Sequence, residues 1–483
     1  MAEFSVNVPW QLILPEGLYR KLHAHLFPGD GDEHGAVIVA GIARTNQGVR
    51  LLARDVRLAV DGKDYVPGRR GYRMLKAEFI REQISHCRDE ELVYLAVHNH
   101  GGYDQVAFSS DDLASHERGY PALLDIARGM PIGALVFAQN AIAGDIWLPG
   151  GKRVALSEAK IVGRSLRKLT PAPVKRHVHV DFAYDRQARL FGDAGQDILC
   201  KSKVCIIGLG GAGSLLAEYL GRLGVGNFIL VDPDRVDITN LPRLVAARQV
   251  DALAWLGRKR LPQWMRDMVG RLCRPKVDMA KRNILRANPR ANVTSIFGDF
   301  VDLEVVKQIL DCDYLFLAAD SARARLLFNA IVHQYLIPGV QVGAKVSTDK
   351  ESGNINDVFA VTRTVTSEAG CMLCNGLINA SRLQQESISE KVRKAQAYVD
   401  EPGVVAPSVI TLNALSTSQA ANDFLFYMTG LRNQDVPVRY LRSHPITGRV
   451  FQDTPRQSPE CTECGTSSSS RLARGDQCCL PMV

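Results

Sequence analysis

The sequence has no apolar run of about eighteen residues or more, although 46% of its 483 residues are hydrophobic. Its first residues, MAEFSVNVPWQ, lack a basic segment followed by an apolar core. Neither a membrane span nor a secretory signal is therefore predicted, and we expect a cytoplasmic protein. Long runs of like charge are also absent. The formal net charge of +8 is spread along the chain, which disfavours nucleic acid as a partner.

The cysteines do not suggest a disulfide framework, because eleven is an odd number and the chain has no secretory features. Their spacing suggests a metal site instead. Cys371 and Cys374 form one CxxC pair, and Cys461 and Cys464 form another. Each such turn presents two thiolates to one ion, so the two pairs predict a tetrahedral, structural zinc site.

Changes in composition divide the chain, in which no internal repeat is evident. Residues 1–155 show mixed strand and helix patterns, and 181–466 is predicted to form a second domain. Between them, a Gly-Gly turn, a basic amphipathic stretch and a Pro-x-Pro predict a linker over 156–180. The Ser-rich segment 467–483 has little apolar surface to offset ordering entropy, and it is predicted to be disordered.

The stretch KVCIIGLGGAGSLLAEYLGRLGVGNFILVDPD, residues 203–234, has the pattern of a strand, a glycine turn, a helix and a second strand. The turn contains Gly208, Gly210, Gly211 and Gly213. Without side chains, these residues let backbone N–H groups approach phosphate oxygens at the positive end of the helix. Asp232 ends the second strand, where an acid usually binds a ribose hydroxyl. The stretch therefore predicts a nucleotide-binding Rossmann unit.

Further motifs flank this unit. They are YDRQARLFGDAGQ (184–196), NLPR (240–243), RPKVDMAK (274–281) and LFLAADSARARLLFN (315–329). With them, the sequence over roughly 182–465 resembles the ThiF/MoeB family, the adenylating core shared with ubiquitin-activating enzymes. The CxxC pairs match the structural zinc knuckle of that family. The resemblance implies an α/β fold in which a Rossmann-like adenylation domain follows the N-terminal domain.

The flanking motifs supply charges that suit the activation of a carboxylate by ATP. Pyrophosphate leaves the α-phosphate in this reaction, so cations must surround the developing negative charge. The available cations are Arg186, Arg243 and Lys276. Asp320 follows the apolar strand YLFLAA and can hold Mg²⁺, because the carboxyl ends of such strands face the ligand crevice. Asn240 can donate a hydrogen bond to a phosphate.

The resemblance also implies the substrate and the partners. Family members adenylate the C-terminal glycine of a ubiquitin-like or sulfur-carrier protein. The family arginine that matches Arg186 reaches into the partner subunit's site, which implies a homodimer or a pseudo-dimer. Arg325 and Asn329 match family positions too, although a helix-surface role is an equal alternative. A bacterial cytoplasm and a companion conjugating enzyme are expected.

The acceptor of the activated carboxylate is uncertain because many family members carry a catalytic cysteine in the crossover loop. This chain has no cysteine between Cys374 and Cys461. Transfer would then go directly to another protein's thiol or through a residue of this chain. The candidates in the chain are Ser387, Ser389, Cys478 and Cys479. No base that would activate a serine is identifiable nearby.

A long insertion separates Arg243 from Lys276. Its core, LAWLGRKRLPQWMRDMVGRLCR, is basic and amphipathic. One interpretation is a solvated helix that packs Trp255 and Trp264 onto the domain. The other is a docking surface for an acidic partner.

The N-terminal third carries a separate set of candidate metal ligands. In YLAVHNHGGYDQVAFSSDDLASH (94–116), His98 and His100 lie on one face at the end of an apolar strand. Two imidazoles and one carboxylate from the next helix would form a catalytic zinc site that keeps a fourth position for water. Asp112 is our choice for the carboxylate, and Asp111 is its rival.

Two further residues complete this predicted site. Glu33 precedes another apolar strand and is available as a general base, and Ser109 could stabilise an oxyanion. The pattern resembles the JAMM (JAB/MPN) metalloprotease motif, whose Ser-x-x-Asp register favours Asp112. Two departures are a stretch between His100 and Ser109 that is one residue longer than usual, and a glycine after His100 where proline is common.

The JAMM resemblance implies a mixed α/β domain that hydrolyses peptide or isopeptide bonds after the C-terminal glycine of ubiquitin-like proteins. A degenerate scaffold without zinc is the alternative. Together, the two resemblances predict an enzyme that adenylates a ubiquitin-like protein and also processes or deconjugates it, as in bacterial conjugation pathways. Two other functions remain open: activation of a sulfur carrier for cofactor synthesis, and a binding scaffold with one or both sites inactive.

Overall fold

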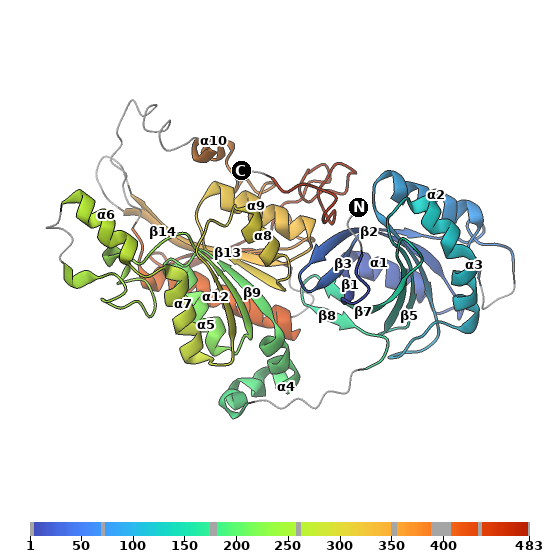
Figure 1. Ribbon diagram of the computed structural model, residues 1–483, viewed down its shortest axis with the longest axis horizontal. Coiled ribbons are helices and arrows are strands. Elements are labelled where there is room, and N and C mark those ends of the chain that lie inside the picture. Colours follow the sequence, from blue (N-terminus) through green and yellow to red (C-terminus); the bar gives the residue numbers. More distant parts are fainter. Residues whose placement is uncertain are drawn as a thin grey trace. The chain divides into compact units, whose positions relative to one another are not determined.

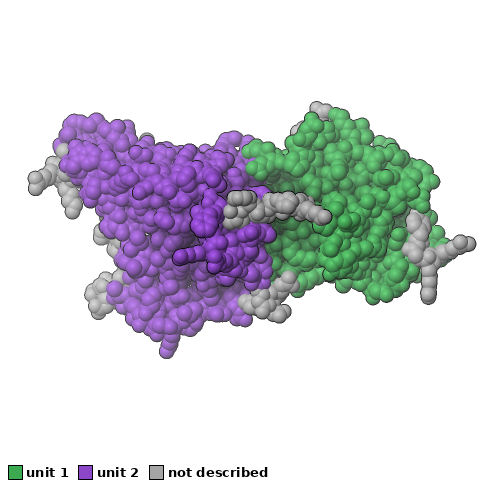
Figure 2. Space-filling view, turned by 90° about the horizontal axis from the view of Figure 1, so that it is seen from below, with its two compact units in different colours: residues 1–177, 333–336, 459–479 green, residues 178–332, 337–458, 480–483 purple. Residues whose placement is uncertain are grey.

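The computed structural model describes residues 4–68, 73–173, 181–256, 262–348, 355–387, 407–432 and 437–481. The chain forms two compact units (Figure 2). Unit 1 comprises residues 1–177, 333–336 and 459–479, and unit 2 comprises residues 178–332, 337–458 and 480–483. Each unit is built around its own eight-stranded sheet. Within the described ranges, no helix has both the length and the apolar character needed to cross a membrane.

Unit 1 is a mixed α/β fold. Its strands are β1 (Trp10–Pro15), β2 (Gly35–Thr45), β3 (Gly48–Leu58), β4 (Val93–Asn99), β5 (Ile132–Phe137), β6 (Ile142–Trp147), β7 (Arg153–Val162) and β8 (Arg167–Leu169). Its helices are α1 (Glu16–Leu26), α2 (Ala77–Asp89) and α3 (Ser110–Ala127).

The sheet of unit 1 closes on itself, because β1 pairs with both β3 and β7 in the order β1-β3-β2-β4-β5-β6-β7-β8. Strand β2 is apolar on both faces. Ala36 and Ile38 contribute to the core that includes residues of α1, while Val37 and Val39 contribute to the core that includes residues of α2 and α3. This double burial explains the continuous apolar run of β2, which follows the loop carrying Glu33.

The structure differs from the predicted linker at 156–180. Residues 156–162 belong to β7, which pairs with β1, and β8 follows at 167–169. Leu156 and Ala159 of β7 are core residues, so this stretch completes the closed sheet. Its basic side chains interrupt the apolar pattern, so the sequence did not indicate a strand here.

The structure also differs from the predicted disordered tail. Residues 467–479, here called the strap, pack on β2. Strand β4 pairs with β2 only as far as Ala40, which leaves the backbone at Ile42 and Arg44 without that neighbour. In the strap, Asp476 donates its N–H to the Ile42 carbonyl (2.7 Å) and its carboxylate accepts the Arg44 N–H (2.8 Å). The strap is ordered because it satisfies these backbone groups.

The strap approaches β2 so closely that Gly41 cannot carry a side chain without a shift, since a Cβ there would lie 2.0 Å from the Ala473 carbonyl oxygen. We expect Gly41→Ala to lower the free energy of unfolding by about 3 kcal/mol, a typical cost of overpacking. Thermal unfolding and proteolysis after Arg471 would measure the effect. Gly119→Ala is the control, because a Cβ at Gly119 meets nothing within 4 Å. Equal melting temperatures for the two variants would contradict the close fit of the strap.

Unit 2 contains most of the remaining elements. Its strands are β9 (Lys203–Ile207), β10 (Asn227–Val231), β11 (Asn292–Ile296), β12 (Tyr314–Leu317), β13 (Gly339–Thr348), β14 (Ile355–Val365), β15 (Tyr440–His444) and β16 (Arg449–Asp453). Its helical elements are η1 (Phe182–Tyr184), α4 (Asp185–Lys201), α5 (Gly211–Arg222), η2 (Ile238–Asn240), η3 (Ala254–Leu256), α6 (Gln263–Leu272), α7 (Lys276–Ala287), α8 (Leu303–Ile309), α9 (Ala322–Gln334), α10 (Ala380–Ser387) and α12 (Ile410–Thr429).

The sheet of unit 2 has the order β11-β10-β9-β12-β13-β14-β15-β16. Figure 1 labels β9, β13 and β14 of this sheet. The strands from β11 to β13 are parallel and the rest are antiparallel. The strand order reverses between β9 and β12, and a doubly wound sheet binds ligands beyond the carboxyl ends of its strands at such a point. The Rossmann unit expected at 203–234 is thereby confirmed, with β9, α5 and β10 in the predicted places.

The insertion before Lys276 forms η3 and α6, but its tryptophans do not pack onto the domain as one interpretation expected. Trp255 is 62% exposed and Trp264 is 66% exposed. Within α6, Val269 is buried, whereas Trp264, Met268 and Leu272 recur every four residues on an exposed face. The apolar stripe of this amphipathic helix therefore faces outward.

Candidate functional site

The glycine turn after β9 forms a narrow backbone loop at the switch point of the sheet. Gly208 has φ of +87°, and a Cβ there would lie 2.9 Å from the backbone nitrogen of Ala319, which follows β12. Gly208 thus lets the ends of β9 and β12 approach each other. A Cβ on Gly210, the N-cap of α5, would meet nothing within 4 Å. The turn is consequently open to a ligand at the N-terminus of α5.

Two acids and a lysine lie beside this turn. Asp232 is 4% exposed, and its carboxylate accepts hydrogen bonds from the backbone N–H groups of Leu209 (2.5 Å) and Asp234 (2.8 Å). Burial raises the pKa of Asp232, although Lys276 and the Leu209 N–H oppose that shift. Lys276 begins α7 and places Nζ 2.7 Å from Asp234 and 3.9 Å from Asp232. The predicted ribose ligand Asp232 therefore braces the turn, while Asp234, with a side chain 65% exposed, is the more accessible acid.

Arg243 and Asn413 lie against the first turn of α5. A Cβ on Gly211 would be 2.3 Å from Nδ2 of Asn413 and 3.6 Å from Cδ of Arg243. Asn413 comes from α12, about two hundred residues later in the chain, so no local pattern could have indicated it. Asn240, the predicted phosphate ligand, is the last residue of η2, and its side-chain oxygen accepts the N–H of the N-cap residue Asp237 at 3.4 Å.

Asp320 is exposed between β12 and α9, the position predicted for a Mg²⁺ ligand. It has an electrostatic interaction with Arg325 of α9. The N-terminus of α9 is capped by the carboxylate of Glu386, which accepts the N–H groups of Ala322 and Arg323, each at 3.0 Å. The structure thus gathers Lys276, Arg243 and the end of β12 around the glycine turn. Arg186 is exposed on α4, and its role in a partner's site stays a prediction.

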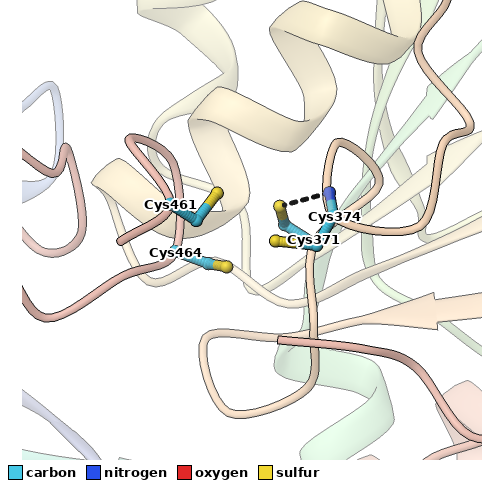
Figure 3. Close-up of side chains that lie close together, drawn as sticks. All are labelled: Cys371, Cys374, Cys461 and Cys464. Carbon is cyan, nitrogen blue, oxygen red and sulfur yellow. Dashed lines mark hydrogen bonds between the residues drawn. The ribbon is translucent and has the colours of Figure 1, made fainter. Parts of the chain in front are cut away.

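The CxxC pairs converge as the spacing predicted (Figure 3). One sulfur atom from each of Cys371, Cys374, Cys461 and Cys464 lies within 4.8 Å of the others. The turn at Cys371 closes when the Cys374 N–H donates to the Cys371 sulfur at 3.4 Å, and Glu463 N–H donates in the same way to Cys461. Four thiolates with such donors suit a closed tetrahedral zinc site.

Asn329, for which a surface role was one alternative, is fully buried in α9. Its side-chain oxygen accepts the Met372 N–H at 2.9 Å, inside the first CxxC turn. Asn329 therefore holds the backbone that presents Cys371 and Cys374.

The candidate acceptors in the chain have different surroundings. Ser387 ends α10, but its side chain, like all of Ser389, lies outside the described residues. Cys478 belongs to the strap and is half-buried, with its sulfur 3.6 Å from an Arg471 guanidinium nitrogen. Cys479 is exposed.

In unit 1, the predicted metal ligands form a compact cluster at the end of β4. The Nε2 atoms of His98 and His100 are 3.2 Å apart. The carboxylate of Asp112, in the first turn of α3, lies 3.5 Å from His98 Nε2 and 3.3 Å from His100 Nε2. Tetrahedral ligands at a zinc distance of about 2.0–2.1 Å are separated by about 3.3–3.4 Å. The donor set fits zinc, and Asp112 rather than its exposed neighbour Asp111 completes it.

Supporting hydrogen bonds orient these ligands. His100 Nδ1 lies 3.1 Å from the Ala107 carbonyl, to which it can donate while Nε2 faces the cluster. Ser109 is the N-cap of α3, and its hydroxyl donates to Asp112 at 2.7 Å while it accepts the Asp112 N–H. Burial raises the pKa of Asp112, but the hydrogen bonds with His98 and Ser109 outweigh burial and leave that pKa below its usual range. Ser109 thus positions the carboxylate, and a role toward an oxyanion stays a prediction.

Glu33 stands beside the cluster without belonging to it. Its carboxylate is 3.8 Å from His100 Nε2, and burial raises its pKa against the opposing effect of His98 and His100. A carboxylate that lies next to a metal site and has a raised pKa is suited to act as a general base.

One pair of residues near this cluster was not identified from the sequence. His116 on α3 is buried, with Nδ1 3.1 Å from the carboxylate of Asp145 on β6. Asp145 also accepts hydrogen bonds from Trp147 (3.0 Å) and Arg153 (2.7 Å). This network anchors the helix that carries Asp112. No short motif connects α3 with β6, so the sequence offered no signal.

The cap at Ser109 leads to a test. We expect Ser109→Ala to destabilise unit 1 by about 1 kcal/mol through loss of the N-cap. We also expect it to weaken zinc binding by roughly 10-fold to 100-fold, because Asp112 loses its hydrogen-bond donor. Competition with a zinc chelator measures the affinity, and Ser109→Thr, which keeps the hydroxyl, should restore it. Unchanged affinity in Ser109→Ala would mean that the cap does not support the site.

One family model matches the chain, mainly in unit 2. The ThiF family matches residues 184–466. A tRNA threonylcarbamoyladenosine dehydratase of Escherichia coli (strain K12) is 35% identical over 158 residues, which is 32% of this chain and 51% of that protein. A molybdopterin-synthase adenylyltransferase of the same organism is 29% identical over 239 residues, 49% of this chain and 79% of that protein.

These likenesses are partial. The chain spans 51% and 62% of the lengths of the two tRNA threonylcarbamoyladenosine dehydratases first matched, from Escherichia coli and Bacillus subtilis. Among solved structures, E. coli MccB with ATP is 18% identical, with 60% of this chain and 77% of that chain covered. The TM-score of this match is 0.42.

Proposed function

Because this chain belongs to the ThiF family, we propose that unit 2 uses ATP to adenylate the C-terminal glycine of a ubiquitin-like or sulfur-carrier protein. The observation that supports this function best is the arrangement at the switch point of the sheet. An open helix N-terminus at Gly210 lies beside Lys276 and Arg243, and an exposed acid, Asp320, follows the neighbouring strand.

Each of these residues has a role in carboxylate activation. A carboxylate oxygen of the substrate attacks the α-phosphorus, the bond to the bridging oxygen breaks, and pyrophosphate leaves. The N–H groups at the start of α5, together with Lys276 and Arg243, stabilise the negative charge that develops on the phosphates. Asp320 would hold Mg²⁺, which neutralises phosphate oxygens. Asp234, more accessible than Asp232, suits the ribose hydroxyl.

A protein carrier is favoured over a tRNA-linked carboxylate as the substrate. The sequence match covers 79% of a molybdopterin-synthase adenylyltransferase but 51% of a tRNA threonylcarbamoyladenosine dehydratase. The likeness to a sulfur carrier protein ThiS adenylyltransferase of Bacillus subtilis spans 74% of that protein, at 26% identity. A match over most of a relative's length supports a shared substrate class more strongly than a higher sequence identity over a shorter segment does. The homodimer and the conjugating enzyme expected from the sequence stay predictions.

For unit 1, we propose a second activity, hydrolysis of a peptide or isopeptide bond by a zinc site of the JAMM type. The donor set of His98, His100 and Asp112 fits zinc, which would polarise a carbonyl and activate water. Glu33 takes a proton at its carboxylate and returns it to the leaving amine. The CxxC cluster would bind a second, structural zinc. Cleavage after the glycine that unit 2 activates would let one chain process and activate the same carrier.

Pyrophosphate exchange into ATP tests the adenylation. The protein is incubated with Mg²⁺, labelled pyrophosphate and a panel of ubiquitin-like and sulfur-carrier proteins that end in glycine. Exchange that requires one of these carriers would support the proposal. Silence across a panel that a known activating enzyme turns over would contradict it and favour a binding scaffold.

A further inference from the structure

One face of the antiparallel half of the unit 2 sheet is cationic. Arg363 of β14 pairs in register with Gln341 of β13 and with Tyr440 of β15. Arg442 of β15 pairs with Val361 of β14, two residues from Arg363, so the two arginines share a face. On the opposite face, Thr362 donates to the Ser416 carbonyl of α12 at 2.9 Å. The arginine face is therefore the one that α12 does not cover.

A third arginine, Arg325, joins this face from α9. Arg363 interacts electrostatically with both Arg325 and Arg442, and Arg325 interacts with Asp320. We call Arg325, Arg363 and Arg442 the arginine row. The row extends from the neighbourhood of Asp320, the acid proposed to hold Mg²⁺, to β15, the third strand beyond β12 in the sheet. Burial and the two neighbouring guanidinium groups lower the pKa of Arg363 to about 10, while Tyr440 and Asp453 oppose that shift.

The row has unused hydrogen-bonding capacity. Among the described residues, no hydrogen-bond partner reaches the buried Nε atoms of Arg325 and Arg442 or the buried Nε2 of His444, two residues beyond Arg442. An unsatisfied buried polar group costs about 1–3 kcal/mol. These buried nitrogens are out of a ligand's reach, so an acidic ligand would pair with the outer guanidinium nitrogens, and the Arg442 side chain is 42% exposed.

The acids nearest to the row have other contacts. Glu386 caps α9 through two backbone N–H groups, and Asp357 lies 2.9 Å from His444 Nδ1. Asp453 is 3.6 Å from Arg442, a long ion pair with both side chains partly exposed. Asp320 and Glu386 also interact electrostatically with Arg325, and Asp453 does so with Arg363, so these acids offset the charge of the row in part. Phe451, whose ring lies beneath the Arg442 guanidinium at 5.4 Å, adds an apolar wall.

We propose that the arginine row selects carriers whose C-terminal segment has an acidic side chain about three to five residues before the terminal glycine. The inference rests on the proposed adenylation, because it takes the reacting carboxylate to lie beyond the carboxyl end of β12. Neighbouring strands are about 4.8 Å apart, so Arg363 is about 10 Å from β12 and Arg442 about 14 Å. An extended peptide advances about 3.3 Å per residue, which gives the stated positions.

A carboxylate fits the row better than a nucleic acid does. The row offers a few half-buried guanidinium groups, each with directed donors that match a single carboxylate. A phosphate backbone prefers exposed, repeated cations along a groove. The row therefore favours a carboxylate ligand, and binding of RNA is the competing outcome of the test.

The test uses the full chain and synthetic octapeptides that end in Gly-Gly, with Glu, Gln or Lys at the fourth position from the end. Peptide affinity is measured by calorimetry with Mg²⁺ and a non-hydrolysable ATP analogue, and adenylation is measured separately by pyrophosphate exchange. We expect the Glu peptide to bind at least about 10-fold more tightly than the Gln peptide, and the Lys peptide to bind most weakly. Arg442→Gln and Arg363→Gln should abolish the preference, Arg442→Lys should partly restore it, and the KM for ATP should not change. Arg222→Gln removes an exposed arginine of α5 and is the matched control.

The two readouts separate this inference from the proposed function. A preference for Glu that the variants lose, without any exchange, would support the row and contradict adenylation. Exchange at equal rates with all three peptides would support adenylation and overturn the row. The row would also be overturned if no peptide bound to the native protein at millimolar concentration. Loss of affinity for a single-stranded RNA oligonucleotide in the same variants, without a peptide effect, would assign the face to nucleic acid instead.

Discussion

Asp320→Asn is expected to reduce carrier-dependent pyrophosphate exchange by at least about 100-fold, the scale seen when one charge-stabilising group is removed from an active site. The substitution keeps the size of the side chain but removes the negative charge that would hold Mg²⁺ between β12 and α9. Since Asp320 is exposed, the variant should fold normally. The KM for ATP should change much less than kcat, because the glycine turn and Lys276 remain.

Glu304→Gln is the control for this experiment, because it removes an exposed carboxylate of α8 that pairs only weakly with Lys307. It should retain full exchange. Rising Mg²⁺ concentration should partly rescue Asp320→Asn, which a purely structural defect would not allow. Exchange at the native rate in Asp320→Asn would show that the metal is bound elsewhere.

The second large effect concerns metal content. We expect the native protein to hold two zinc ions per chain, one at His98, His100 and Asp112 and one at the CxxC cluster. His98→Ala combined with His100→Ala should reduce the content to one ion and abolish cleavage of a carrier fused through its terminal glycine. The loss in cleavage rate should exceed about 1,000-fold, because the site that activates water is removed.

Glu33→Gln separates metal binding from chemistry. Glu33 is 3.8 Å from His100 Nε2, but it is outside the ligand set, so this variant should keep both zinc ions and still lose cleavage. Elemental analysis and cleavage of the fusion are measured on the same samples. A native protein with a single zinc and no cleavage would indicate that unit 1 is a scaffold.

The sequence predicted those parts of the sites that depend on local spacing. His98 and His100 share one strand face, Ser109 and Asp112 share one helical turn, and each CxxC pair is a single turn. The glycine turn could also be predicted from the sequence, because a strand, four glycines and a helix follow one another within a short stretch. In each case, nearby residues in the sequence dictate nearby positions in space.

Features that depend on distant pairing could not be predicted. Asn413 reaches Gly211 from α12, and the arginine row exists because β14 pairs with β15 across a long stretch of chain. The strand at 156–162 was not recognised because charged residues interrupt its apolar pattern, and it becomes evident only from its pairing with β1 on one side and β8 on the other. The exposed Trp264 of α6 shows the same limit, since periodicity identifies an apolar face but not the direction in which it points.

The strap also affects how the chain folds as it is made. Residues 1–177 leave the ribosome first, yet the piece that satisfies the backbone at Ile42 and Arg44 is translated only after residues 178–458. At typical elongation rates this interval is on the order of tens of seconds. During that time the incomplete end of β2 offers a free strand edge to any other chain. Production of unit 1 as an isolated N-terminal fragment would make that temporary exposure permanent, so adding the strap as a separate peptide should improve the fragment's solubility.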